Sequence, residues 1–319
     1  MNPDSKIYVA GHTGLVGSAI WRRLQFKGYG RLIGRRHAEL DLERQSEVEA
    51  FFDKERPEYV FLAAARVGGI LANNTYPAEF IYSNLAIQTN IIHASWKTGV
   101  KRLLFLGSSC IYPRECPQPM KETFLLSGPL ESTNEPYAVA KIAGIKTCQA
   151  FNRQYGTKFY SVMPTNLYGP NDNFDLETSH VLAALIRKFH EAKANRRESV
   201  EVWGSGNPRR EFLHVDDLAD GCLFIMSLED SSFSSLLADP FPLVNIGWGK
   251  DLSVKELAEL IRAVIGYEGQ VVFNREKPDG TPRKLLDVSR LTALGWQPGI
   301  SLEDGIRDTY QWAVEERRI

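Results

Sequence analysis

Three glycines at three-residue intervals, in the segment G-H-T-G-L-V-G at residues 11–17, restrict the fold of this 319-residue chain more than any other feature. The segment directly follows the apolar run Ile7–Ala10, and helical periodicity begins just after it. In dinucleotide-binding folds such a turn binds a pyrophosphate: Gly11 permits the tight turn, Gly14 lets backbone N–H groups approach the ligand, and Gly17 lets helix and strand pack closely. The alternative is a glycine turn without a ligand. The candidate cofactor contacts in the turn are Gly11, His12, Thr13, Gly14, Leu15, Val16 and Gly17.

The rest of the first half alternates short apolar runs with helical stretches, which is typical of a parallel sheet covered by helices on both faces. The segment Ser46–Lys54 places Val48, Phe51 and Phe52 at helical intervals, so we expect a crossover helix there. We therefore predict an α/β fold of the Rossmann type, with a doubly wound parallel sheet. The expected strands are Ile7–Ala10, Leu32–Gly34, Val60–Ala64, Leu103–Leu106 and Tyr160–Met163.

The character of the sequence changes after the fifth of these strands. The segment P-T-N-L-Y-G-P-N-D-N-F, residues 164–174, is dense in Pro, Gly and Asn and is expected to be mostly loop. The region beyond it mixes amphipathic helices with short strands, which indicates a smaller α/β domain. We predict a nucleotide-binding domain over residues 1–165 and a mainly substrate-binding domain over residues 166–319, from which the chain can cross back. The elements expected there include the helix Ser253–Ile265 and the strands Val200–Trp203 and Val271–Phe273.

Charge and cysteine content narrow the class of protein. Lys and Arg number 38 and Asp and Glu number 39, so no net field attracts nucleic acid or an anionic membrane, and an anionic ligand has to be held by local groups. The start M-N-P-D-S-K has no signal-peptide pattern, and no stretch approaches the about 18 apolar residues of a membrane span, so we expect a soluble, cytoplasmic protein. The four cysteines lack C-x-x-C spacing, which argues against a disulfide framework and against a metal site.

Basic residues follow the second expected strand. Folds that bind NAD usually place Asp or Glu there for the ribose 2′-hydroxyl, whereas this chain has Arg35, Arg36 and His37. Two fixed positive charges suit a 2′-phosphate, which favours NADP as the cofactor. A solvated basic surface turn is the alternative.

A tyrosine–lysine pair follows later in the chain. Tyr137 and Lys141 stand four residues apart at the start of an apolar-periodic segment, so a helix would place the phenol and the ammonium on one face. A cation ~4 Å from a phenol, at an effective dielectric of ~20, favours the phenolate by ~4 kcal/mol, or roughly three pK units before desolvation. We therefore expect the pKa of Tyr137 to fall toward the range useful for acid–base catalysis. The motif is common by chance, but it gains weight after a dinucleotide turn and with Ser108 at the end of an intervening strand.

The glycine turn, the strand-end serine and Y-x-x-x-K together resemble the extended short-chain dehydrogenase/reductase family. Further segments are similar to one branch of it, the 3,5-epimerase/4-reductases that convert GDP-4-keto-6-deoxy-D-mannose to GDP-L-fucose. The likeness runs over essentially the whole chain, and it implies a bifunctional NADPH-dependent enzyme and a homodimer. The segments are A-A-A-R-V-G-G-I-L-A-N-N (63–74), G-S-S-C-I-Y-P (107–113), T-N-E-P-Y-A-V-A-K-I-A-G-I-K (133–146), P-T-N-L-Y-G-P-N-D-N-F (164–174), W-G-S-G-N-P-R-R-E-F-L-H-V-D-D (203–217) and K-P-D-G-T-P-R-K (277–284).

The resemblance implies catalytic roles for five residues. The C4 ketone of the substrate acidifies the hydrogens on C3 and C5, so one base and one acid can epimerise both positions. Cys110, in the family's S-x-C segment, would be the base if a positive neighbour tunes its thiol, and His180 would return the proton from the opposite face. Tyr137 would protonate the alkoxide formed at C4, while Ser108 hydrogen-bonds the carbonyl oxygen and Lys141 holds the ribose and biases the phenol. The alternatives are a buried structural cysteine and a capping or core histidine.

The resemblance also implies contacts to both ligands. For the GDP-sugar, Arg210 is the best candidate for a bidentate phosphate clamp, although the sequence leaves open whether Arg209 or Arg210 points inward. Thr13 and Lys188 occupy positions that are Arg in some relatives, so phosphate contacts are expected to differ there. The candidate GDP-sugar contacts are Lys188, Trp203, Arg210, Asp279 and Lys284. The candidate NADP contacts beyond the glycine turn are Arg35, Arg36, His37, Asp41, Leu42, Leu106, Gly107, Lys141, Pro164, Thr165, Asn166, Leu167 and His180.

Two other functions stay open. An NAD-retaining sugar-nucleotide 4-epimerase or 4,6-dehydratase would share the glycine turn and Y-x-x-x-K. The dehydratases, however, usually carry an Asp-Glu pair after the strand-end hydroxyl, where this chain has Ser109 and Cys110. A cofactor-binding regulator without catalysis typically loses the Tyr or the Lys of the motif, and this chain keeps both.

Overall fold

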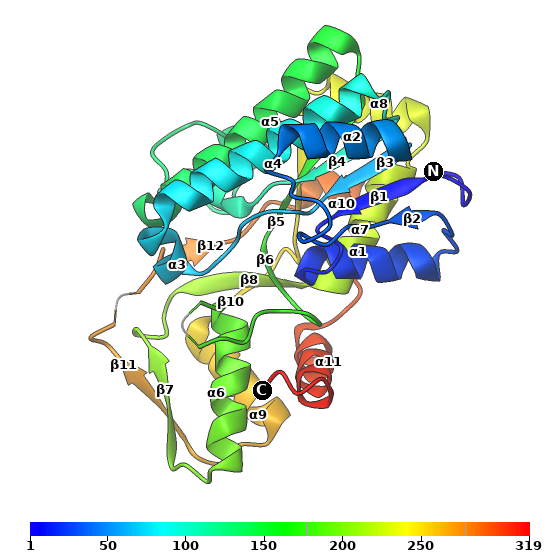
Figure 1. Ribbon diagram of the computed structural model, residues 1–319. Coiled ribbons are helices and arrows are strands. Elements are labelled where there is room, and N and C mark those ends of the chain that lie inside the picture. Colours follow the sequence, from blue (N-terminus) through cyan, green and yellow to red (C-terminus); the bar gives the residue numbers. More distant parts are fainter. Residues whose placement is uncertain (177, 278) are drawn as a thin grey trace.

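A six-stranded, all-parallel sheet forms the centre of the larger part of the molecule (Figure 1). The computed structural model describes residues 1–176, 178–277 and 279–319. The strand order is β2-β1-β3-β4-β5-β9, so it reverses between β1 and β3, and such a switch point is where doubly wound sheets bind ligands. The predicted fold class is therefore confirmed. The strands are β1 (Ile7–Ala10), β2 (Leu32–Ile33), β3 (Tyr59–Leu62), β4 (Arg102–Leu106), β5 (Phe159–Pro164) and β9 (Leu243–Ile246).

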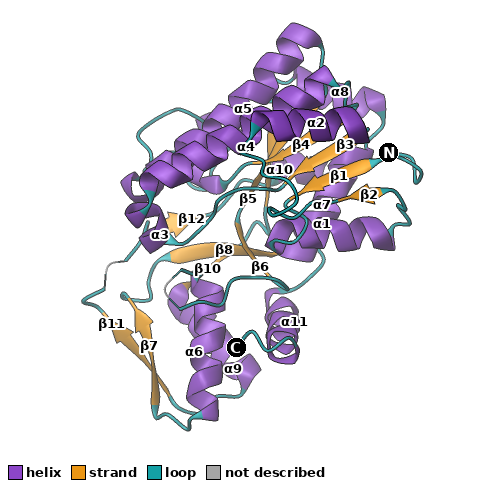
Figure 2. Cartoon of the chain, viewed as in Figure 1, coloured by secondary structure: helices purple, strands orange, loops and turns teal. Residues whose placement is uncertain are grey.

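Helices cover both faces of this sheet, and each face has its own core (Figure 2). Successive side chains of a strand point to opposite faces, so Tyr8 and Ala10 belong to one cluster while Ile7 and Val9 belong to the other. The first cluster is completed by α2 (Gln45–Glu55), α4 (Pro77–Lys97) and α5 (Glu135–Tyr155). The second is completed by α1 (Leu15–Phe26), α7 (Val215–Ser227), α8 (Asp230–Ala238) and α10 (Ser289–Ala293).

The chain crosses repeatedly between the larger and the smaller part. Residues 215–246 and 289–296 come late in the sequence, yet they pack on the large sheet through α7, α8, β9 and α10. The division at residue 165 remains a prediction of the sequence analysis.

The smaller part is built on a third apolar cluster. Its helices are α6 (Val181–Ala194), α9 (Val254–Ile265) and α11 (Leu302–Glu315). Its strands are β6 (Asn166–Tyr168), β7 (Ser199–Trp203), β8 (Arg209–His214), β10 (Asp251–Ser253), β11 (Gln270–Asn274) and β12 (Arg283–Lys284). The prediction that residues 164–174 are mostly loop is confirmed, although Pro164 ends β5 and the three residues of β6 pair in parallel with β8.

Local capping explains where α9 begins and ends. Ser253, expected to be its first residue, is its N-cap: its hydroxyl accepts the backbone N–H of Glu256, and the Glu256 carboxylate accepts the N–H of Ser253. Gly266 ends the helix in the left-handed conformation, at φ +70°.

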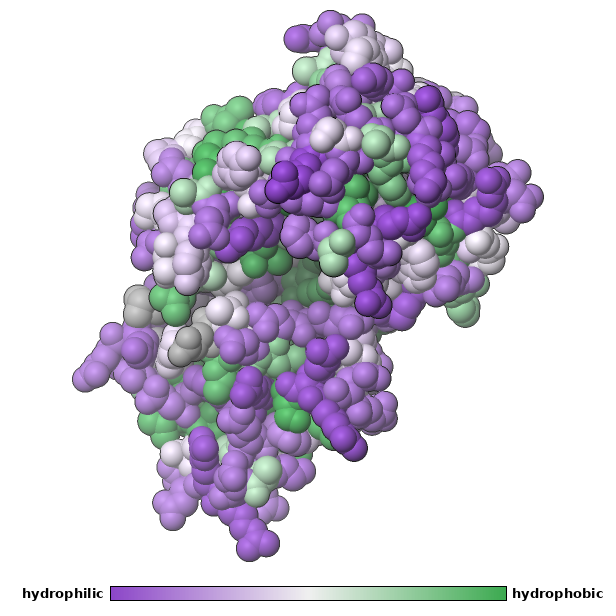
Figure 3. All heavy atoms as spheres, in the orientation of Figure 1, coloured by the Kyte–Doolittle hydropathy of each residue, from purple (hydrophilic) through white to green (hydrophobic). Residues whose placement is uncertain are grey.

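Four short helices connect the main elements near the point where the two parts meet. They are α3 (Ile70–Thr75), η1 (Ser109–Ile111), η2 (Glu122–Phe124) and η3 (Ser132–Asn134). The surface is hollowed between the two parts, with apolar atoms at the floor of the hollow (Figure 3). Within the part of the chain that the structure describes, no helix has the length and apolar content needed to cross a bilayer.

Candidate active site

The glycine turn lies at the carboxyl end of β1, at the switch point of the sheet. A Cβ at Gly17 would lie 2.0 Å from the carbonyl oxygen of Gly11, so only glycine lets α1 start this close to the strand. A Cβ at Gly11 would lie 2.8 Å from backbone atoms of Ala64, on the neighbouring strand's exit. The N-cap residue Gly14 provides no side-chain cap, so the first N–H groups of α1 are available to an anion. The turn therefore fits the pyrophosphate of a dinucleotide.

His12 in this turn carries a ring nitrogen, Nδ1, that is buried without a hydrogen-bond partner among the described residues. Its ring lies 5.3 Å from that of Trp21 and fills the space above Gly34, where a Cβ would approach it to 2.5 Å. Burial lowers the pKa of His12, and the charges of Arg36 and Arg35 act in the same direction. A neutral imidazole with a free nitrogen suits a ligand hydroxyl or phosphate oxygen.

The two arginines after β2 differ in their surroundings. The Arg35 guanidinium forms an ion pair with Glu55 at 3.0 Å and donates to the carbonyl of Gly34 at 2.8 Å. Arg36 is exposed, and no ion pair of its guanidinium occurs among the described residues. Arg36 is therefore the arginine left to contact a 2′-phosphate.

The other predicted cofactor residues lie at or near the carboxyl ends of the strands. His37 is exposed, within 4.0 Å of the Asp41 carboxylate, and the carbonyl of Leu42 accepts the side-chain amide of Asn90. Leu106 and Gly107 end β4, while Pro164, Thr165, Asn166 and Leu167 run from β5 into β6. Thr13 is exposed at the tip of the glycine turn.

Cys110 lies directly after β4, in η1, and is 7% exposed. The Ser108 hydroxyl caps this helix by accepting the backbone N–H of Cys110 at 3.3 Å. Burial raises the pKa of the Cys110 thiol, while the Ser108 hydroxyl and the charges of Lys284 and Lys141 act to lower it. A thiol in this position needs a cation to become a base.

Tyr137 and Lys141 project from the first turns of α5 toward the same strand end. The ammonium of Lys141 donates to the carbonyl of Leu106 at 2.8 Å and lies 5.7 Å from the centre of the Tyr137 ring. The expectation of a lowered pKa for Tyr137 is wrong: burial raises it, and the potential of Cys110 adds to the effect. Burial also lowers the pKa of Lys141 to about 8. Desolvation therefore outweighs the attraction of the pair, and Tyr137 stays a protonated hydrogen-bond donor.

His180 is the N-cap residue of α6, in the smaller part of the molecule. The loop before it is fixed to the large part, because the backbone N–H of Gly69 donates to the carbonyl of Thr178 at 3.0 Å. His180 is exposed at the surface. Desolvation by the protein atoms around its ring nevertheless lowers its pKa, and the positive charge of Lys284 acts in the same direction. Lys284 thus acts electrostatically on both His180 and Cys110.

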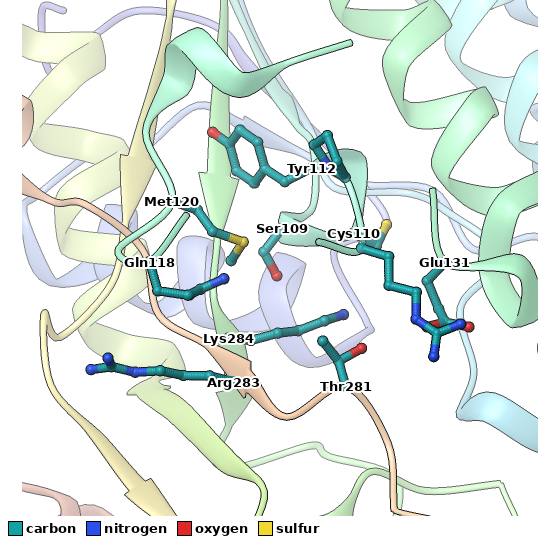
Figure 4. A pocket seen from close by; sticks show the side chains of 11 residues that line it. Ser109, Cys110, Tyr112, Gln118, Met120, Glu131, Thr281, Arg283 and Lys284 are labelled. Carbon is teal, nitrogen blue, oxygen red and sulfur yellow. The ribbon is translucent and has the colours of Figure 1, made fainter. Parts of the chain in front are cut away.

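A small pocket opens beside Cys110, between η1 and β12 (Figure 4). Lys284 extends into it from β12, and its amine end is directed toward the side where Cys110 and Glu131 lie. The pocket residues Arg114, Gln118, Met120 and Glu131 were not predicted from the sequence, because no motif marks them. The lining residues are Ser109, Cys110, Tyr112, Pro113, Arg114, Gln118, Met120, Glu131, Thr281, Arg283 and Lys284.

Arg209 and Arg210 are neighbours on β8 but have different partners. Arg209 forms ion pairs with Asp251 at 2.9 Å and Glu256 at 3.3 Å, so it stabilises the fold. Arg210 forms no ion pair among the described residues; its guanidinium donates to the carbonyl of Arg209, and a Cβ at Gly280 would approach it to 2.9 Å. The geometry therefore leaves Arg210 available to an anion.

Trp203 is 53% exposed at the end of β7, and two ammonium groups lie near its ring. The Nζ of Lys188 lies 5.1 Å from its ring centre and that of Lys277 lies 5.2 Å from it. Sequence analysis did not single out Lys277, although it begins the K-P-D-G-T-P-R-K segment. Asp279 accepts the backbone N–H and the hydroxyl of Ser205 at 2.8 and 2.6 Å, which fixes the end of that segment beside β7. An aromatic surface with adjacent cations suits a base and its phosphates.

The comparisons with known proteins agree with this geometry. Residues 7–236 match the model of the NAD dependent epimerase/dehydratase family. A putative GDP-L-fucose synthase 2 from Arabidopsis thaliana is 60% identical, covering 99% of this chain and 93% of its own length. The GDP-L-fucose synthase of Escherichia coli is 55% identical, covering 98% and 97%.

Solved structures share the whole fold. A GDP-mannoheptose C4 reductase from Campylobacter jejuni with NADP bound is 40% identical, with a TM-score of 0.90 over 98% of this chain and 99% of that one. A GDP-L-fucose synthetase from Naegleria fowleri bound to NADP is 29% identical, with a TM-score of 0.90 over 100% of this chain and 95% of that one.

Proposed function

Because this chain belongs to the NAD dependent epimerase/dehydratase family and its relatives at 55–60% identity are named as GDP-L-fucose synthases, one of them as putative and one as probable, we propose that it converts GDP-4-keto-6-deoxy-D-mannose to GDP-L-fucose with NADPH. The observation that carries the proposal is that Cys110, Ser108, Tyr137 and Lys141 meet at the end of β4, at the same edge of the sheet as the dinucleotide turn. A thiol at this position suits proton exchange beside an existing ketone better than elimination of water.

Epimerisation comes first in this mechanism. The Cys110 thiolate removes a proton from the carbon next to the ketone, so an S–H bond forms, a C–H bond breaks and the electron pair moves onto the C4 oxygen. His180, on the α6 side, returns a proton to the opposite face of the carbon. Ser108 donates to the C4 oxygen, where negative charge develops. The same pair of residues serves C3 and C5.

Reduction uses the same carbonyl. NADPH, when bound, supplies the hydride for C4. Tyr137 donates its phenolic proton to the C4 oxygen, and its raised pKa keeps that proton in place until the alkoxide forms. Lys141, anchored to the carbonyl of Leu106, holds the nicotinamide ribose.

The GDP end of the substrate is assigned to the smaller part. Arg210 binds the diphosphate bidentately, because its neighbour Arg209 is already paired. Trp203 and Lys188 contact the nucleotide, and Asp279 contributes a polar contact beside them. Lys284, which the resemblance also offers as a phosphate contact, lines the pocket beside Cys110 instead. Arg36 contacts the 2′-phosphate of the cofactor.

We also propose that the protein is a homodimer and is located in the cytoplasm. The helices α4 and α5 pack against each other on the outside of the large sheet and expose Tyr82, Val139 and Tyr155, which are 66%, 40% and 45% exposed. A second copy that covers these side chains would bury a four-helix interface.

Product analysis by NMR tests the function. The purified chain is incubated with GDP-4-keto-6-deoxymannose and either NADPH or NADH. GDP-L-fucose formed preferentially with NADPH is the expected result. An unreduced ketone, with interconversion of a 4-hydroxy GDP-sugar and its C4 epimer in a parallel incubation and no net oxidation of NADPH, would indicate a 4-epimerase. Cofactor binding without turnover would indicate a regulator.

A further inference from the structure

Residues 281–287, here called the strap, connect the two parts of the molecule beside Cys110. Their first half belongs to the smaller part, where Arg283 and Lys284 pair with Arg209 and Arg210 of β8. Their second half is bound to the large part: the N–H of Met120 donates to the carbonyl of Leu285 at 2.7 Å. In Figure 1, β12 accordingly lies between the large sheet and the lower helices. The strap thus sets the position of Lys284 relative to both parts.

Further hydrogen bonds, some from side chains and one between backbone groups, fix the second half of the strap. The N–H of Leu285 donates to the side chain of Gln118 at 2.9 Å, and the N–H of Asp287 donates to the carbonyl of Met120 at 2.8 Å. The side-chain amide of Asn245, on β9, donates to the carbonyls of Met120 and Asp287. The backbone on the carboxyl side of Lys284 therefore has little freedom to move.

The side chain of Glu211, on β8, is hydrogen-bonded to the strap. Its side chain is fully buried, and it accepts the N–H of Leu286 at 2.9 Å and that of Gly249 at 2.6 Å. A third N–H, from Trp248, also donates to it, and a Cβ at Gly247 would lie 2.3 Å from its carboxylate. No cation pairs with this carboxylate among the described residues. The Thr165 side chain also hydrogen-bonds this carboxylate. A buried carboxylate that accepts several backbone N–H groups fixes the course of the chain.

Two ammonium groups lie near the Cys110 thiol, and they are not equivalent. That of Lys141 is bound to the carbonyl of Leu106 at the end of β4. That of Lys284 extends into the pocket that Cys110 lines, and it has neither an ion pair nor a hydrogen bond within the described ranges (Figure 4). Lys284 is therefore the cation whose charge is available to the thiol.

The remaining charged groups around the pocket are already engaged or lie farther away. Glu131 forms an ion pair with Arg114 at 3.5 Å, and its charge still reaches Lys284. Arg283 is paired with Asp251 at 2.5 Å. The other titratable groups that interact with Lys284 or Cys110 are Cys116, Tyr137, His180 and Arg210.

We propose that the ammonium of Lys284 stabilises the thiolate of Cys110 as the base of the epimerisation, and that Glu211 positions Lys284 by holding the strap. The base role of Cys110 rests on the proposed function, whereas the pairing of Lys284 with Cys110 rests on the geometry of the pocket. The proton taken from the substrate ends on sulfur, and the positive charge stays on Lys284. Lys284 therefore acts through Cys110 and exchanges no proton with the substrate.

The alkylation of Cys110 by iodoacetamide tests the pairing without any substrate. The rate is measured against pH, and peptide mass spectrometry separates Cys110 from Cys116. A nearby cation lowers the pKa of an acid by about one to three units. We expect the midpoint in Lys284→Met to move up by about one to two pH units relative to the unmodified chain and to stay in place in Lys284→Arg. Lys250→Met, which removes an exposed surface lysine, is the matched control. An unshifted midpoint in Lys284→Met overturns the proposal.

Exchange of the C3 and C5 hydrogens with heavy water, measured by NMR without NADPH, tests the consequence. Lys284→Met should exchange at least ten times more slowly at pH 7 and recover part of the rate at higher pH, with an unchanged KM. If Lys284 instead binds the diphosphate, KM rises and the pH profile does not move, which also overturns the proposal. Glu211→Gln should show a smaller shift of the same sign, with thermal unfolding measured alongside. If the unmodified chain exchanges nothing, the proposed function fails, while the alkylation profile still reports on the pairing.

Discussion

Replacement of Gly17 by alanine tests whether the close contact of β1 and α1 creates the cofactor site. The added Cβ would lie 2.0 Å from the carbonyl oxygen of Gly11 and 2.5 Å from its carbonyl carbon. Both are backbone atoms, so no side-chain rotation can relieve the overlap. Ordinary contacts begin at about 3.4 Å, so helix and turn must separate by about 1.4 Å.

This separation moves the first N–H groups of α1 away from the pyrophosphate. The loss of one hydrogen bond to a charged group costs about 1.5–3 kcal/mol, which is an increase of about 10- to 100-fold in the Kd for NADPH. Overpacking of a well-filled site costs a further ~1–3 kcal/mol in the free energy of unfolding. The affinity is measured by quenching of protein fluorescence with NADPH, and stability by urea unfolding.

Gly30→Ala is the matched control. A Cβ at Gly30 meets nothing within 4 Å, and its φ lies outside the left-handed region. We expect unchanged NADPH affinity and equal or slightly higher stability there, because alanine restricts the unfolded chain. NADPH binding by Gly17→Ala within twofold of the control would refute the assignment of the turn as the pyrophosphate site.

Three further predictions follow from the site and its surroundings. Tyr137→Phe should lower the rate of reduction by about 10²- to 10⁴-fold while epimerised keto intermediates accumulate, as followed by NMR; normal reduction would show that another group donates the proton. Arg36→Ala should weaken NADPH binding at least tenfold and leave NADH binding unchanged. Arg35→Ala should mainly reduce the stability of the fold, because it removes the ion pair with Glu55. Equal effects of the two variants on NADPH affinity would contradict these separate roles. Burial raises the pKa of Asp172 to about 7. The stability that this shift contributes is fully present below about pH 4, near the pKa of Asp in the unfolded chain, and is lost as the pH rises to about 7. Asp172→Asn should therefore flatten the decline of the urea midpoint between pH 4 and 7, and an unaltered slope would count against the shift.

Local signals in the sequence predict the first half of the fold well. The glycine turn, the run before it and the helical spacing of Val48, Phe51 and Phe52 depend on neighbours within one turn or one strand, so β1, α1 and α2 lie where they are expected. β9 was not expected, because its four residues gain their place only by pairing with β5. β12 was not expected either, since its two residues are defined by their register with β8.

Local sequence signals also predict only part of the site, because burial and long-range contacts determine the rest. Motifs brought out Ser108, Tyr137 and Lys141, but their spacing carries no information on burial, which decides the direction of the Tyr137 pKa. The choice between Arg209 and Arg210 depends on Asp251, which reaches Arg209 only after β10 pairs with β8. Glu211 follows the two arginines in sequence, yet nothing local distinguishes its buried carboxylate from a surface one.

The large sheet needs residues from late in the chain, so we expect that the protein cannot be divided at residue 165. A chain truncated after residue 165 would retain β5 but lose β9, so the main-chain groups of Ser161, Val162 and Met163 that pair with it would become an unprotected edge. It would also lose α7, whose apolar side covers one face of that sheet. Such a truncated chain should self-associate rather than bind NADPH, and an autonomous cofactor-binding unit has to include residues up to about 296.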